Sequence, residues 1–261
     1  MTKITVLTDN RSDGKYLHEH GLSFYIKTDS NKKILFDTGQ SDIFLKNAET
    51  LGVDVNSVDV VVLSHGHWDH GNGLLFLRDK TLICHPDCFT KRYRKWTMLN
   101  IGLNTSLDEM QGRFNLILSK NPYPVSKDVI FLGEIPRNNT FEAKSTPFRL
   151  KNKKDDFVND DSGLAIMSDL GLIVISGCAH SGICNTVEYA KEITGIEKVH
   201  AVIGGFHLKK VDDITLKTIE YFKDNSIENV YPCHCVNDCV MKVLSLHFPT
   251  RPISAGVMLN L

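Results

Sequence analysis

The sequence predicts an α/β protein, a four-layer αββα sandwich in which helices cover the outer faces of two packed sheets. Short apolar strands occur in series near both ends of the 261-residue chain, and helical patterns lie between them. A chain of this length can bury a sizeable core in one or two domains. We expect one domain, residues 1–261, with residues from about 89 to 160 forming an insertion over the mouth of the active site.

In the first half of the chain, strands joined by short turns predict an antiparallel meander at the start. Each expected strand is a short apolar series that ends at polar or turn-forming residues. The expected strands are 4–7, 22–26, 33–36, 58–63 and 81–84, and the expected helices are 41–51 and a short one at 71–77.

Residues 89–160 interrupt this alternation, and we expect strands there at 114–118 and 129–132. Strand and helix alternate again in the second half. The expected elements are a hairpin of strands 163–167 and 172–176, strands 199–203 and 229–231, and helices 181–193, 212–222 and 236–247.

The segment Ser64-His65-Gly66-His67-Trp68-Asp69-His70 follows the strand that ends at Leu63. Three imidazoles and one carboxylate within six residues suit zinc or, less selectively, iron or manganese. A loop can turn all four inward, whereas a helix or strand with this spacing cannot. The alternative is a solvated histidine-rich loop, but it would require three histidines and one aspartate to follow a buried strand by chance.

This segment resembles the first metal motif, H-x-H-x-D-H, of the metallo-β-lactamase superfamily. Further blocks resemble the branch that includes the archaeal dihydropterin ribofuranosyl-aminobenzene phosphate synthase of methanopterin biosynthesis. These blocks are LFDTG (35–39), GEIPR (133–137), SGCAH (176–180), GGFHL (204–208) and PCHC (232–235). The branch tends to have His-Cys-Thr-Gly where this chain has His234-Cys235-Val236-Asn237. The resemblance implies the sandwich fold, with metals in a cleft at one edge between the sheets.

A dinuclear centre needs ligands beyond His65, His67, Asp69 and His70. His180 follows a buried strand, and His234 resembles the last metal histidine of the superfamily. Cys178 stands where many members have a bridging Asp, so it is either a thiolate ligand or a bystander.

Three further residues compete for the second metal. Asp160 and Asp161 are alternative donors of the bridging carboxylate. His207 is a ligand, a catalytic or substrate-contacting residue, or a structural histidine.

Several neighbouring residues have open roles. Asp37, at a strand end, either supports the metal loop or forms a turn. His85 is favoured as structural over a substrate contact. For the basic series 91–96, we favour a solvated surface; the alternative is a rim of the active site that attracts an anionic group of the substrate. Cysteines 84, 88 and 184 are expected to be buried residues or free thiols. Residues 233–239 contain three cysteines and one histidine and could form a separate structural zinc site, although the spacing of these residues is unusual for one.

The ligands predict a metal-dependent hydrolase acting on a small anionic substrate. One or two zinc ions, with iron or manganese as possibilities, would lower the pKa of bound water from ~15.7 to about 7 and supply hydroxide. Asp69 would be a ligand of the second metal or the base that orients this water, and His207 could stabilise charge or donate a proton.

The resemblance also leaves other functions open. A pterin-pathway synthase that condenses a phosphoribosyl donor is the main alternative. A di-iron redox protein is disfavoured because that family usually has Glu at the position of His67. A metal-binding module without turnover is the third alternative.

Charge and composition limit the partners. The formal net charge is −1, so no bulk field points to nucleic acid or to a membrane surface. No apolar run reaches the ~18 residues of a membrane span. The N-terminus shows no secretory pattern, so we expect a reduced, cytoplasmic chain with a small-molecule substrate.

Overall fold

The first sheet of the computed structural model, which describes residues 1–249 and 253–261, has seven strands. They are β1 (Lys3–Thr8), β2 (Ser23–Lys27), β3 (Lys33–Phe36), β4 (Val60–Val62), β5 (Lys80–Cys84), β7 (Phe114–Leu118) and β15 (Met258–Asn260), in the order β15-β1-β2-β3-β4-β5-β7. β1, β2 and β3 pair antiparallel, which confirms the predicted meander. β3, β4, β5 and β7 run parallel, so β1, β3 and β4 end at the same edge.

The second sheet has six strands in the described part of the chain. They are β8 (Tyr123–Ser126), β9 (Val129–Phe131), β11 (Gly163–Ser168), β12 (Gly171–Ser176), β13 (Val199–Gly205) and β14 (Asn229–Cys233), in the order β14-β13-β12-β11-β9-β8. β11 and β12 form the predicted antiparallel hairpin. β12, β13 and β14 are parallel, so their carboxyl ends also meet at one edge.

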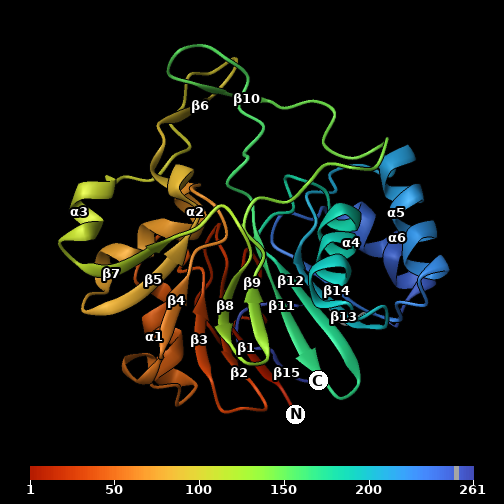
Figure 1. Ribbon diagram of the computed structural model, residues 1–261, viewed down its shortest axis with the longest axis horizontal. Coiled ribbons are helices and arrows are strands. Elements are labelled where there is room, and N and C mark those ends of the chain that lie inside the picture. The colour runs from red at the N-terminus through yellow and green to blue at the C-terminus, as the bar shows by residue number, and fades with distance from the viewer. Residues whose placement is uncertain (250–252) are drawn as a thin grey trace.

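Helices cover the outer face of each sheet (Figure 1). They are α1 (Ile43–Thr50), α2 (Trp68–Gly71), α3 (Leu107–Gln111), α4 (Ile183–Thr194), α5 (Asp213–Asp224) and α6 (Asp238–His247). Phe44 of α1 and Met110 of α3 pack with one face of the first sheet. Ile183 and Phe222 pack, with residues of α6, on the second.

The two sheets face each other across a shared apolar core. Phe24 and Phe36 from the first sheet meet Phe131 and Ile175 from the second in this core. Because separate apolar clusters also lie outside each sheet, the chain forms the predicted αββα layers. Among the described residues, no helix is both long enough and apolar enough to cross a bilayer.

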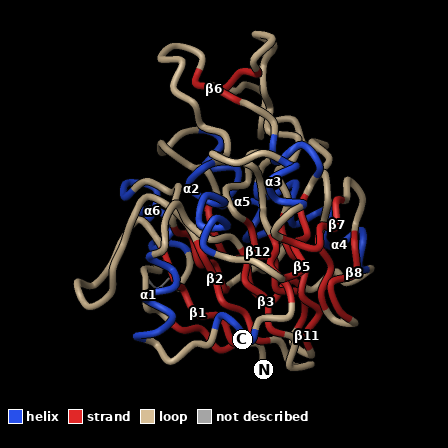
Figure 2. Tube along the Cα trace, turned by 90° about the vertical axis from the view of Figure 1, so that its left-hand side faces the viewer, coloured by secondary structure: helices blue, strands red, loops and turns tan. Residues whose placement is uncertain are grey.

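The segment 89–160, expected as an insertion, divides between two locations. β7 and β8 are edge strands of the two sheets of the sandwich, and β9 pairs between β8 and β11. Only β6 (Arg92–Arg94), β10 (Phe148–Leu150) and the loops around them stand apart, as a two-stranded sheet at the end far from both termini (Figures 1 and 2). The part that can cover the site is therefore narrower than the sequence predicted, because local sequence does not show that the strands at 114–118 and 129–131 join the two large sheets.

Candidate metal centre

The side chains predicted to carry chemistry lie at one edge of the sandwich, where β3, β4, β12, β13 and β14 end. Four non-glycine residues there have left-handed backbone: Asp37, Ala179, His207 and His234, with φ of 56°, 51°, 51° and 49°. This conformation is uncommon for side chains other than Asn and Asp, and it concentrates where function requires a particular direction. The strand ends are therefore bent to aim side chains into a common space.

One group of imidazoles comprises His65, His67 and His180. His65 Nε2 and His67 Nδ1 are 3.0 Å apart, and the His180 ring centroid lies 4.9 Å from that of His65 and 4.8 Å from that of His67. Burial, reinforced by neighbouring histidines, lowers the pKa of all three well below the usual value. They are therefore neutral near pH 7, which is the form that binds a cation.

A second group comprises Asp69, His70 and His234. His70 Nε2 and His234 Nε2 are 3.0 Å apart, and Asp69 Oδ2 lies 3.4 Å from His234 Nε2. Burial opposes ionisation of Asp69, but hydrogen bonds from His20 and His234 hold its pKa well below the usual value. His20, from the loop before β2, was not foreseen; its Nε2 is 3.1 Å from Asp69 Oδ2.

The sulfur of Cys178 lies between the two groups. It is within the ligand spacing of His65 and His180 on one side and of His70 and His234 on the other, and it is 3.3 Å from His70 Nε2. Cys178 also lies close to His207 and Cys235. Cys235 is a second residue that the sequence analysis did not place in the site.

The two neighbouring thiols differ in acidity. Burial raises the pKa of Cys178, which also donates a hydrogen bond to Cys235. Burial opposes ionisation of Cys235 as well, but hydrogen bonds from Cys178 and His207 lower its pKa well below the usual thiol value.

Residues outside the two groups fix the orientation of the imidazoles. Asp37 Oδ2 accepts a hydrogen bond from His70 Nδ1 at 2.7 Å, while the Ser64 amide donates to Asp37 Oδ1 at 2.7 Å. Asn10 Oδ1 lies 2.9 Å from His234 Nδ1. These contacts direct the Nε2 atoms of His70 and His234 into the common space, so Asp37 supports the metal loop rather than serving only as a turn residue.

The carboxylates of Asp160 and Asp161 accept hydrogen bonds from backbone amides. Asp160 Oδ2 accepts from the Gly66 amide at 2.7 Å, and its other oxygen is 2.8 Å from the buried Arg92 guanidinium. Asp161 Oδ2 accepts from the Ser181 amide at 2.8 Å. Neither carboxylate joins a metal-capable group among the described residues. Of the three residues considered for the bridging position, only Cys178 lies between the two groups.

Other predicted alternatives lie elsewhere. His85 is buried and its Nδ1 accepts from the Asp87 amide at 3.0 Å, which is the structural role that the sequence favoured. Within the described residues, 233–239 do not assemble into a separate zinc site, because Cys233 is buried in the core between the sheets and Cys239 is exposed on α6. Cys84, Cys88 and Cys184 are buried and free, as expected.

A pocket of about 730 Å³ opens over the two groups. Its floor contains Asp69, His180 and His234, and its wall includes Phe148 of β10, from the two-stranded sheet. The exposed cations Arg94 and Lys209 also line it. The segment that stands apart from the sandwich thus contributes to the pocket wall.

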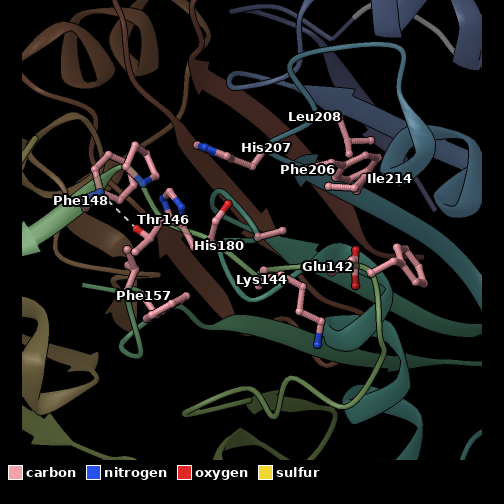
Figure 3. A pocket seen from close by; sticks show the side chains of 17 residues that line it. Glu142, Lys144, Thr146, Phe148, Phe157, His180, Phe206, His207, Leu208 and Ile214 are labelled. Atoms are coloured by element: carbon pink, nitrogen blue, oxygen red, sulfur yellow. Dashed lines mark hydrogen bonds between the residues drawn. The ribbon is translucent and has the colours of Figure 1, made fainter. Parts of the chain in front are cut away.

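A smaller pocket of about 190 Å³ adjoins the first, and His180 and His207 line both (Figure 3). Figure 3 shows Phe206, Leu208 and Ile214 together on one side. The nearby Glu142 carboxylate is buried and accepts from the Cys184 and Asn185 amides at 3.0 Å each, which ties the segment before β10 to the start of α4.

The donor set fits a divalent cation. Imidazole nitrogens of different residues face each other at 3.0 Å, close to the roughly 3.3 Å that separates neighbouring ligands of a tetrahedral zinc ion. His180 Nε2 has no hydrogen-bond partner among the residues described, although it is buried. Such an atom is costly unless something satisfies it, and a cation would do so.

The Metallo-beta-lactamase superfamily matches residues 18–88, which include the histidine loop. An uncharacterized protein of Methanocaldococcus jannaschii, MJ0448, is 35% identical over 250 residues, 93% of each chain. The 7,8-dihydropterin-6-methyl-4-(beta-D-ribofuranosyl)-aminobenzene-5'-phosphate synthase of the same organism is 35% identical over 239 residues, 83% of this chain and 81% of the relative.

Similarity to a solved structure extends over the whole fold. Tm1679, described as a metal-dependent hydrolase of the beta-lactamase superfamily, has a TM-score of 0.89 and 29% identity. The alignment covers 100% of this chain and 99% of Tm1679. The sandwich, the histidine loop and this end-to-end similarity agree, and the chain belongs to the metallo-beta-lactamase superfamily.

Proposed function

We propose that this protein is a metal-dependent hydrolase that acts on a small anionic substrate and uses zinc. The observation that carries the proposal is the placement of two metal-capable groups on the floor of the 730 Å³ pocket, with Arg94 and Lys209 lining the same space. A pocket of this volume suits a small molecule. Two cations beside it favour substrates that carry a phosphate or carboxylate group.

A divalent cation held by these groups would act as a Lewis acid toward water and toward an oxygen of the substrate. The chain supplies the remaining steps. Asp69, ionised and 3.1 Å from His20 Nε2, can orient a water by accepting its hydrogen bond. His20 is half-exposed, so its imidazole can carry the proton of that water to solvent. Arg94 and Lys209 would hold the anionic end of the substrate.

Metal analysis and a substrate panel test this proposal. The purified protein should contain zinc and hydrolyse members of a panel of phosphodiesters, phosphomonoesters and lactones. A double variant, Arg94→Ala with Lys209→Ala, should raise KM for anionic substrates about tenfold, with a smaller effect on kcat, because two surface cations supply roughly 1–2 kcal/mol of binding. Lys210→Ala is the control, since Lys210 is an exposed neighbour that does not line the pocket.

If the metal-loaded protein hydrolyses no member of the panel, the hydrolase proposal is contradicted. An equal KM for the double variant and Lys210→Ala would contradict the role of the two cations.

A second candidate function is a condensation of the kind that the archaeal relative's name describes, and the 35% identity to that synthase favours it. The product in that name carries a phosphate, which the cations at the pocket could also bind. Incubation with a dihydropterin donor and ribofuranosyl-aminobenzene phosphate, followed by mass spectrometry, tests this function. A joined product without hydrolysis of the panel would favour the synthase, and hydrolysis without a joined product would exclude it under these conditions.

A further inference from the structure

Three potential ligands from neighbouring strand ends form a third group, beside the two histidine groups. Cys178, His207 and Cys235 follow β12, β13 and β14, which are adjacent and parallel. Their sulfur and ring-nitrogen atoms all lie within 4.8 Å of one another. Two sulfurs and one imidazole are a donor set that zinc prefers, and the set differs from the nitrogen- and oxygen-rich groups next to it.

The backbone around this group holds the sulfur of Cys235 in place. The His207 amide donates to Cys235 Sγ at 3.1 Å. A Cβ at Gly205 would lie 2.7 Å from the same sulfur and 2.4 Å from the Gly177 carbonyl oxygen, so only glycine allows this approach. His207 takes a left-handed backbone with φ of 51°, a conformation that is costly for histidine. The position of each donor is therefore built by neighbouring residues.

The His207 ring contacts the Cys235 thiol, yet one of its two nitrogens has no hydrogen-bond partner among the described residues. Its Nδ1 atom is buried and has no hydrogen-bond partner in residues 1–249 and 253–261. The ring also lies 4.5 Å, centroid to centroid, from His180, which belongs to the first histidine group. A strained residue that holds a ring nitrogen within ligand spacing of two sulfurs is the arrangement expected of a ligand.

We propose that Cys178, His207 and Cys235 form a thiolate-rich site for a borderline or soft divalent cation such as Zn²⁺, additional to the two histidine groups. The Cys178 sulfur is also within ligand spacing of members of both histidine groups, so it is the shared ligand that couples the three groups. The inference rests on the proposed metal binding and is independent of which bond the enzyme breaks. Of the roles open to His207, it selects that of ligand.

Cobalt(II) provides a direct test because cobalt–sulfur bonds give a charge-transfer absorption in the near ultraviolet that imidazole and carboxylate ligands do not. The full chain would be reduced, freed of metal with a chelator and loaded with cobalt(II) without oxygen. Cys235→Ser should bind about one cobalt fewer per chain and lose about half of this absorption, because one of two thiolates is replaced by a poor ligand for soft cations. His207→Ala should also lose about one cobalt while keeping both sulfurs.

Cys239→Ser is the matched control, since Cys239 is an exposed thiol four residues further along the chain. It should retain the full cobalt content and absorption. The serine in Cys235→Ser can still accept the His207 amide, and unfolding of the metal-free variants checks that the fold is kept. Equal cobalt content and absorption in the wild type and Cys235→Ser would overturn the proposal.

Two other results would also overturn it. One is a disulfide between Cys178 and Cys235 that resists treatment with a reductant. The other is loss of the cobalt–sulfur absorption in Cys239→Ser but not in Cys235→Ser. Absence of hydrolytic turnover would leave these signals unchanged, so failure of the proposed reaction is distinguishable from failure of the third site.

Discussion

At the scale of single residues, the site depends on side chains that do not face the pocket. Asp37 is fully buried and receives hydrogen bonds from the Ser64 amide, the Ser64 hydroxyl and His70 Nδ1, each at 2.7 Å. It therefore links β3 to the histidine loop and fixes which nitrogen of His70 is free. A supporting carboxylate of this kind raises the basicity of the ligand that it holds.

We predict that Asp37→Asn weakens metal binding about 10- to 100-fold while the fold is retained. Asn tolerates the left-handed backbone that residue 37 adopts, with φ of 56°, so the change removes the charge without straining the chain. Competition with a chromophoric chelator measures the affinity. Asp42→Asn, before α1 and away from the metal groups, should leave it unchanged. Equal affinity in the two variants would reduce Asp37 to a turn-forming residue.

The sequence revealed the imidazoles of the site but not all of its members. His65, His67 and His70 lie within six residues, so their spacing alone predicts a cluster. The expectation that a loop carries all of them was wrong, since Asp69 and His70 stand on the single turn of α2. His180 and His234 could be predicted from the sequence because each follows an apolar strand. His20 and Cys235 were missed, since the contact of His20 with Asp69 joins residues 49 positions apart through the packing of two loops. No local pattern contains that information.

At the scale of elements, the connection between β4 and α2 must pass close to other backbone. A Cβ at Gly66 would lie 1.8 Å from the carbonyl oxygen of Cys88, although the φ of Gly66 is not in the left-handed region. Residue 66 is therefore glycine because of space rather than backbone conformation. The amide of Gly66 also donates to Asp160, which connects the loop to the segment before β11.

We predict that Gly66→Ala lowers the free energy of unfolding by about 2–4 kcal/mol and weakens metal binding at least tenfold, since the histidine loop must shift away from Cys88. Gly112→Ala at the end of α3 is the matched control. Its added Cβ would meet its nearest neighbour, the Glu109 carbonyl oxygen, at 3.6 Å, and its φ of −75° suits alanine. Urea unfolding and metal titration measure both effects, and similar values for the two variants would contradict the steric argument.

The elements themselves were predicted unevenly. Strands with long buried patterns, such as β12 and β13, were found with nearly the right bounds. α3 was missed although Ser106 and Glu109 form a capping box, because only five residues follow the cap. The edge strands β8 and β10 were missed because partly exposed positions weaken the apolar alternation that predicts a strand.

At the scale of the whole molecule, the fold brings together chemistry that is distributed from residue 20 to residue 235. Parallel strands that end at one edge account for this, because each strand delivers the residues that follow it to the same place. The four-layer arrangement was predictable from the alternation of strands and helices. The path of residues 89–160 was not, since it depends on which sheet edge each strand joins.

Burying many histidines in one place also makes the stability of the metal-free protein depend on pH. Burial and mutual repulsion lower the pKa of His65, His67 and His180, so their protonation favours the unfolded state. Stability from these three groups is present above pH ~6.5, the unfolded value, and is lost as pH falls below it. His70 differs: burial alone would lower its pKa, but the Asp37 carboxylate raises it to about 9.

The contribution of His70 therefore has the opposite sign. Its stabilisation is complete below pH ~6.5 and is lost as pH rises to about 9, a change of roughly 3 kcal/mol at most. The lowered pKa of Cys235 has the opposite effect over this alkaline range, because a thiolate favoured in the folded state adds stability as pH rises. We therefore predict, for the metal-free Cys235→Ser protein, a free energy of unfolding that is greatest near pH 6.5 and falls on both sides. Urea unfolding with a chelator, between pH 5.5 and 9.5, measures the profile. Asp37→Asn should flatten the alkaline side, because the Asp37 carboxylate is the largest of the influences that raise the pKa of His70. A stability that rises between pH 7 and 9 would show that the Asp37–His70 pair does not govern this range.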